Sequence, residues 1–170
     1  MFATVECEAA IFGCRTIRPD VSPDLPCVLA MAGADHVLDG IPPDRWALLS
    51  ATGTGVVADH FTAANLPAPK IVIPVDGDAT AAHYLRAAEA IGTDPDVCLS
   101  FEDTPAGVDA ARQAGLQVVG VTAHGEPSAL DNADLVVPSL LSVRVLGTHP
   151  FVVFEVDAIP DYGTGAARRR

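Results

Sequence analysis

Two adjacent carboxylates, Glu102 and Asp103, follow a buried apolar run at 97–101 and directly precede a helix. Thr104 is a favoured N-cap for that helix, and Gly115 is typical of its end. In a parallel sheet flanked by helices, the ligand crevice lies at the carboxyl ends of the strands, so this pair predicts a metal or phosphate site. The same carboxylates would also stabilise the helix dipole without binding any ligand, and local physics leaves both roles open.

The thiols are the other candidate reactive groups. The four cysteines, Cys7, Cys14, Cys27 and Cys98, form no CxxC pair and have no histidine at metal-ligand spacing. Neither a zinc site nor a disulfide framework is indicated, and we expect reduced, mostly buried thiols. A nucleophilic Cys14 is disfavoured because the residues after it, beginning with Arg15, include no glycine-rich phosphate loop.

The elements that must position these side chains alternate between short apolar runs and amphipathic helices. This alternation predicts an α/β fold of three layers, built on a doubly wound parallel sheet. The expected strands are 9–12, 46–50, 71–74, 97–101, 117–122 and 135–137, and the expected helices are 55–64, 79–91 and the one that Thr104 begins.

The remaining segments suggest a single domain over residues 1–159. Residues 16–44 form a proline-broken connection with one short helix near 25–34. Runs at 143–146 and 151–156 flank Gly147 and predict a C-terminal β-hairpin, and residues 160–170 are expected to be a disordered tail.

Composition narrows the classes of partner. The chain has 170 residues, 49% of them apolar, and a net charge of −12, which favours one folded domain and disfavours nucleic acid or an anionic membrane. No apolar run reaches the ~18 residues of a membrane span, and Glu6 and Glu8 stand where a signal peptide would be basic. We therefore expect a cytoplasmic protein, and the three terminal arginines do not reverse that expectation.

The stretch 101–115, FEDTPAGVDAARQAG, resembles the fourth motif of the haloacid dehalogenase superfamily, in its branch of sugar-phosphate phosphatases and phosphomutases. The resemblance covers roughly residues 45–145. Residues 45–52, RWALLSAT, are similar to the second motif, in which a strand-end hydroxyl binds the transferring phosphoryl group. Ser50 falls on that position and Thr52 lies beside it, so both are assigned to phosphate binding.

The resemblance implies an aspartate nucleophile on the first strand, an acid/base aspartate two residues later, a lysine or arginine for the phosphate, and Mg²⁺. With a one-residue gap, the nucleophile falls on Gly13 and the acid/base on Arg15; without the gap they fall on Phe12 and Cys14. No Asp or Glu occurs in residues 9–19. The first strand therefore lacks the nucleophile in either register.

The phosphate-binding lysine is also replaced. Its position falls on Asp78, and the single lysine, Lys70, stands at the far end of the preceding strand. Glu102 and Asp103 then form the remnant of a metal site, expected to be empty. In the gapped register Arg15 would pair with one of them in place of Mg²⁺.

The superfamily's helical cap usually lies between the first two motifs, and residues 16–44 are too few to form it. An open crevice exposes apolar surface that the side chains Ile17, Leu25, Val28 and Leu29 would cover or use as a self-complementary patch. A homodimer is expected on that ground.

Together these departures predict a catalytically degenerate, capless member of the superfamily. It would act as a binding or scaffolding module with no cofactor, through its own dimer or a protein partner, and a small phosphorylated ligand fits the crevice. The alternative is a phosphatase of small phosphate monoesters that uses Mg²⁺ and a rearranged active site.

Overall fold

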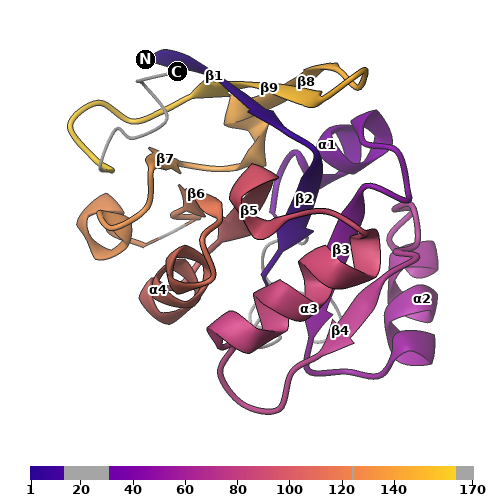
Figure 1. Ribbon diagram of the computed structural model, residues 1–170. Helices are drawn as coiled ribbons and strands as arrows, with labels where there is room; N and C mark the ends of the chain where they lie inside the picture. The colour runs from indigo at the N-terminus through magenta and orange to yellow at the C-terminus, as the bar shows by residue number, and fades with distance from the viewer. Residues whose placement is uncertain (14–30, 124, 164–170) are drawn as a thin grey trace.

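The computed structural model describes residues 1–13, 31–123 and 125–163, and its centre is a parallel sheet of six strands in the order β4-β3-β2-β5-β6-β7 (Figure 1). All five pairings in this sheet are parallel. The first strand of this sheet, β2, lies in its middle, and later strands are added outward on both sides, as the predicted α/β fold requires. The strands are β2 (Ala9–Phe12), β3 (Trp46–Ser50), β4 (Val72–Pro74), β5 (Cys98–Glu102), β6 (Gln117–Val121) and β7 (Leu135–Val137).

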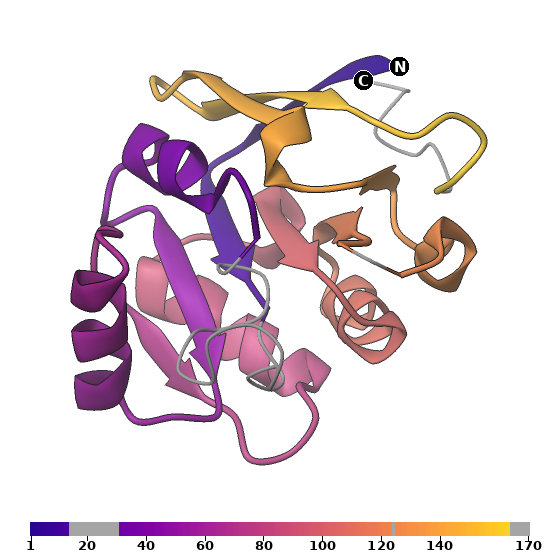
Figure 2. The ribbon, with the colours of Figure 1, turned by 180° about the vertical axis from the view of Figure 1, so that it is seen from behind.

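Helices cover both faces of this sheet, which gives the three expected layers (Figures 1 and 2). α3 (Ala81–Ile91) and α4 (Pro105–Gln113) pack on the face that carries Ala9 and Ile11. α1 (Ala34–Gly40) and α2 (Thr54–Ala63) contribute to the core on the other face. Successive residues of β2 belong to opposite cores because strand side chains alternate in direction.

A row of five aromatic rings runs through the core that α1 and α2 cover. Phe12 stacks on Phe101 of the neighbouring strand with ring centroids 5.1 Å apart, and it meets Trp46 edge-on at 5.8 Å. The row continues from Trp46 to Phe61 of α2 and from Phe101 to Phe154. It thereby joins three central strands to the helix on one side and to a second sheet on the other.

That second sheet has three antiparallel strands in the order β1-β9-β8: β1 (Phe2–Cys7), β9 (Val152–Asp157) and β8 (Val143–Gly147). The predicted hairpin is confirmed as β8 and β9. The strand β1 was not predicted, although Val5 and Cys7 alternate with exposed residues along it. It pairs along its whole length with β9, from Phe2 opposite Asp157 to Cys7 opposite Val152.

The helix expected near 25–34 falls mostly outside the described residues. Residues 14–30 lie outside the described residues, and the described helix begins at Ala34, where the expected one ended. Gly33 sets this start: its φ of +96° is left-handed, and a Cβ there would overlap the backbone of Leu140 and Leu141. The prolines had suggested a break earlier in the chain than the one the packing at Gly33 imposes.

Two thiols match the expectation of reduced, buried cysteines. Cys7 and Cys98 are free and buried, and burial raises the pKa of each to about 12. Both are protonated and unreactive at neutral pH. Cys14 and Cys27 lie outside the described residues. None of the helices in the described ranges combines the length and apolar character needed to cross a bilayer.

The aromatic row predicts a large loss of stability when its middle ring is removed. Phe101→Ala deletes a fully buried ring that contacts both Phe12 and Phe154, and we expect the free energy of unfolding to fall by about 3–5 kcal/mol in urea titrations. Phe2→Ala is the control, because that ring is 69% exposed and should change stability by less than ~1 kcal/mol. Equal effects of the two substitutions would contradict the role given to the row.

Candidate functional site

The carboxyl ends of β3, β2 and β5 lie side by side and bring the predicted site residues to one edge of the sheet. Ser50 is the last residue of β3, Gly13 follows β2, and Glu102 ends β5. The Gly13 amide donates to the Phe101 carbonyl at 3.1 Å, which continues the sheet pairing one step beyond β2. The three positions that the motifs singled out therefore lie together at the carboxyl edge of the sheet, where an open α/β fold places its ligand crevice.

Two hydroxyls form one wall of this crevice. The Oγ atoms of Ser50 and Thr52 lie 3.0 Å apart, and the Thr52 amide donates to Ser50 Oγ at 3.1 Å. Ser50 is almost fully buried, so its orientation is fixed by the strand and by this turn. The pair can present hydroxyl donors to an anion at the strand end, as the sequence predicts for phosphate binding.

Glu102 turns inward and fills the space beside Gly13. Its side chain is 2% exposed, and Ser100 Oγ donates to its Oε1 at 2.5 Å. A Cβ built on Gly13 would overlap the Glu102 carboxyl group, and so would a Cβ on Gly107 in α4. The two glycines thus provide the room that the carboxyl group occupies, and Gly13 leaves none for a side chain of its own.

Burial strongly shifts the protonation of this carboxyl group. Burial raises the pKa of Glu102 to about 8, against the lowering effect of hydrogen bonding by Ser100 and Tyr84, while Asp103 adds a smaller upward effect. The Tyr84 hydroxyl is buried next to Glu102, and burial, then the Glu102 charge, raises its pKa. Glu102 is therefore mainly a neutral acid at pH 7.

A neutral, inward-turned acid is a poor ligand for a divalent cation, because metal binding needs the deprotonated carboxylate. Asp103 beside it is half-buried and is the other carboxylate of the pair. Within residues 1–13, 31–123 and 125–163, no three His, Cys, Asp or Glu side chains come together in a way that could hold a metal ion. The described residues alone do not fit the Mg²⁺ site that the superfamily resemblance implies.

Lys70, the single lysine, and Asp78, which stands at the position of the family's phosphate-binding lysine, lie at opposite ends of β4. Lys70 is exposed and precedes β4, which places it at the amino end of that strand, away from the crevice. Asp78 is exposed and follows β4 in the loop before α3, on the crevice side. The crevice edge at β4 therefore carries a negative side chain where a phosphate would need a positive one.

Arg15, the predicted partner of Glu102 or Asp103, lies outside the described residues, and so does Cys14. The same holds for the predicted apolar patch of Ile17, Leu25, Val28 and Leu29. The ion pair of Arg15 and the dimer patch stay predictions. No described residue forms a separate cap over the crevice, in agreement with the expected capless fold.

Sequence reasoning missed two residues of the site, Ser100 and Tyr84. Ser100 lies two residues before Glu102 on β5, so the period of a strand already places both side chains on one face. Tyr84 falls within the predicted helix 79–91, and its hydroxyl gave no separate signal. Both matter because Glu102 turns toward them.

The overlap at Gly13 predicts that even one added methyl group is destabilising. Gly13→Ala should lower the free energy of unfolding by about 1–3 kcal/mol, because the new Cβ must displace the buried Glu102 carboxyl group. In the background of Glu102→Ala, which removes that carboxyl group, the same substitution should cost much less.

Gly55→Ala is the matched control, since a Cβ at that helical position meets nothing within 4 Å. It should be neutral or stabilising, as expected for an exposed glycine in a helix. Additive losses from Gly13→Ala and Glu102→Ala in the urea cycle would contradict the proposed steric contact.

The raised pKa of Glu102 predicts a stability that falls with rising pH. The folded protein holds this proton between pH 4.5 and about 8 whereas the unfolded chain releases it, so the stabilising contribution is complete below 4.5 and is lost as pH rises through 8. The variant Glu102→Gln tests this prediction, because it keeps a neutral group of similar size.

The free energy of unfolding of this variant should decline less than that of the wild type from about pH 5 to about pH 8.5. Glu89→Gln, an exposed control, should leave the decline unchanged; parallel wild-type and Glu102→Gln curves would refute the protonated state.

Comparisons with known proteins give the following relatives. No family model matches the chain. Hexitol phosphatase A of Escherichia coli (strain K12) is 32% identical over 127 residues, covering 69% of this chain and 57% of the relative. Validoxylamine A 7'-phosphate phosphatase of Streptomyces hygroscopicus subsp. limoneus is 30% identical over 129 residues, covering 72% of this chain and 61% of the relative. The chain thus spans about three fifths of the length of these curated relatives.

Among solved structures, a HAD family hydrolase from Deinococcus radiodurans R1 with bound phosphate and sodium has a similar fold. The TM-score is 0.56 at 24% sequence identity, over 65% of this chain and 55% of that one. At this level of identity the likeness concerns the fold alone, and it agrees with the parallel sheet and helices described above.

Proposed function

The chain belongs to the haloacid dehalogenase-like superfamily, in its branch of sugar-phosphate phosphatases, and within that family we propose that it is a binding module that does not carry out phosphoryl transfer. The single observation that carries this proposal is the pair Gly13 and Glu102. In the gapped register of the first motif, Gly13 supplies no side chain at the position of the nucleophile, and the Glu102 carboxyl group occupies the space that a Cβ at Gly13 would need.

The chemistry of the family depends on a carboxylate that attacks the phosphorus atom and is itself phosphorylated. Among the described residues, the carboxyl group that lies against Gly13 is that of Glu102, which is buried and mainly protonated at pH 7. A protonated acid has no charge to use in attack.

Binding of a phosphorylated ligand requires fewer groups than phosphoryl transfer, because it needs hydrogen-bond donors but no nucleophile. The hydroxyls of Ser50 and Thr52 supply donors at the strand end, and they support weak binding of a small phosphorylated ligand. In our proposal the crevice is open and the module acts through a second copy of the chain or another protein, in the cytoplasm and without a resident cofactor.

A phosphatase with a rearranged active site is the second candidate. It is favoured by the identity of 32% to hexitol phosphatase A and by the retained hydroxyl and carboxylate positions, Ser50, Glu102 and Asp103. Such an enzyme would use Mg²⁺ and would need a nucleophile from outside the described residues. In the segment 14–30 the sequence offers Cys14 for that role.

The two candidates differ in turnover. We expect no hydrolysis of p-nitrophenyl phosphate or of hexitol phosphates above the buffer rate, with or without Mg²⁺, because Gly13 offers no carboxylate to accept the phosphoryl group and Glu102 beside it is mainly protonated at pH 7. Release of inorganic phosphate is the measurement. Mg²⁺-dependent turnover that Asp103→Ala abolishes and that Asp59→Asn on α2 leaves intact would overturn the proposal and establish the phosphatase. Turnover that survives Asp103→Ala would indicate a contaminant.

A further inference from the structure

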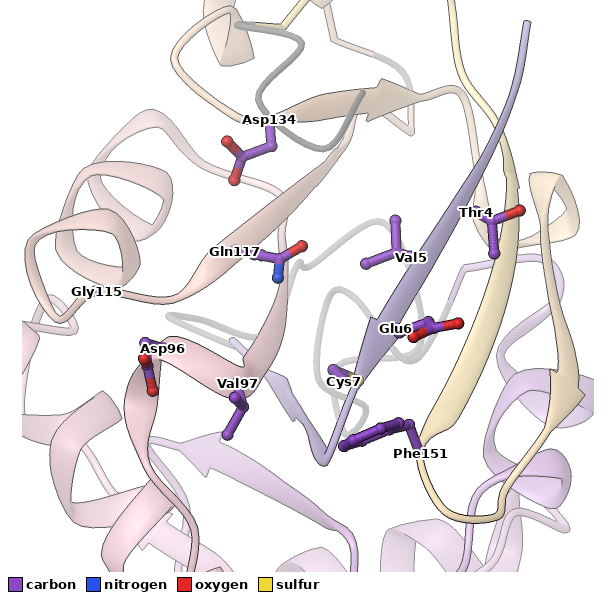
Figure 3. A pocket seen from close by; sticks show the side chains of 10 residues that line it. All are labelled: Thr4, Val5, Glu6, Cys7, Asp96, Val97, Gly115, Gln117, Asp134 and Phe151. Atoms are coloured by element: carbon purple, nitrogen blue, oxygen red, sulfur yellow. The ribbon is translucent and has the colours of Figure 1, made fainter. Parts of the chain in front are cut away.

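A pocket of about 530 Å³ lies at the end of the molecule opposite the crevice (Figure 3). One wall is formed by residues 4–7 of β1. The other is formed where β5 and β6 begin, by Asp96, Val97 and Gln117, together with Asp134. Because these residues precede the strands whose carboxyl ends form the crevice, the pocket is separate from the candidate site.

The strand β1 borders this pocket with a free edge. Among the described residues it pairs with β9 alone, and β9 lies on the side of β1 away from the pocket (Figure 3). In an antiparallel ladder, alternate backbone groups point to opposite sides of the strand, so β1 directs unpaired N–H and C=O groups toward the pocket. Pairing with the main sheet starts only after β1 ends, where the Glu8 amide donates to the Val97 carbonyl at 2.8 Å.

The lining of the pocket is acidic. Glu6 and Asp96 are exposed at its rim, and among the described residues no lysine or arginine belongs to the lining. Asp134 is buried and already bound, because it pairs with Arg112 at 2.9 Å and accepts from the Val118 amide at 2.8 Å. The charge that faces a ligand therefore comes mainly from Glu6 and Asp96, and it favours a cationic one.

The side chains of β1 specify which residues an added strand would carry. Val5 and Cys7 are buried and project inward, whereas Thr4 and Glu6 are exposed on the outer face. An added strand places its own side chains alternately beside these two sets. Apolar residues fit over Val5 and Cys7, and basic residues fit beside Glu6.

We propose that the free edge of β1 and the pocket beside it bind an extended peptide segment of a partner protein, in which basic residues alternate with apolar ones. Backbone pairing with β1 supplies affinity, and Glu6 and Asp96 select the basic side chains. This site does not depend on whether the crevice is catalytic.

The probe is a fluorescein-labelled six-residue peptide of alternating arginine and valine, matched to the six residues of β1. Titration of the full chain should give saturable binding by fluorescence anisotropy, with the largest amide chemical-shift changes in residues 2–7. The double variant Glu6→Gln, Asp96→Asn should weaken binding about tenfold or more. Asp59→Asn on α2, which removes an exposed charge elsewhere, should leave affinity unchanged.

The same peptide with alternate amides N-methylated keeps its charge but cannot pair with a strand edge. It should bind at least about tenfold more weakly. Equal binding of the methylated peptide, or no effect of the double variant, would overturn the proposal in favour of unspecific charge attraction. A chain ending at Gly163 that binds the probe about tenfold more tightly than the full chain would also overturn it. That result would mean that residues 164–170, with their three arginines, compete for the pocket, so that its occupant is internal.

Discussion

The stacking of Phe12 on Phe101 is the contact on which the rest of the architecture depends. It joins β2 and β5 at the middle of the sheet, where the winding of the chain changes direction. The residue after Phe12 is Gly13 and the residue after Phe101 is Glu102, so the same contact sets how close those two positions come. Packing in the core and chemistry at the crevice are thus fixed by one pair of rings.

In the crevice, the Glu102 carboxyl group occupies the space that a side chain at Gly13 would otherwise need. A glycine on one strand allows the carboxyl group of the next strand to turn inward, and Ser100 then holds that group by a hydrogen bond. A carboxyl group in this position is shielded from water, so it favours its neutral form. An edge of a sheet that is suited by topology to phosphate chemistry is therefore occupied by an uncharged acid.

The main sheet could largely be predicted from the sequence, because parallel strands buried on both faces have continuous apolar sequences. The strands β2, β3 and β7 begin and end at the predicted residues. The strand β1 was harder to predict, because it is half-exposed and its partner β9 lies far away in the sequence. The start of α1 depends on a close approach of Gly33 to the backbone at Leu141, which no local pattern encodes.

Some residues of the candidate site could be predicted from the sequence and others could not. Ser50, Thr52 and Glu102 were predicted from motif positions, and the strands do bring Ser50 and Glu102 to one edge. The roles of Ser100 and Tyr84 could not be predicted, because they depend on the direction in which Glu102 turns. That direction is decided by the empty volume at two glycines, which is a property of packing rather than of spacing.

The pairing of β1 with β9 has a consequence for the order in which the molecule assembles. Phe2 lies opposite Asp157, so β1 finds its partner only after the chain between them, nearly all of the described residues, has been made. Until then, β1 and the apolar side chains of its inner face lack their cover, while β2 to β7 can already form a sheet. Contacts so distant in sequence also form slowly, because a long loop must close first. The small sheet is therefore the last part of the fold to be completed, and its unpaired strands are the segments most exposed to wrong association during synthesis.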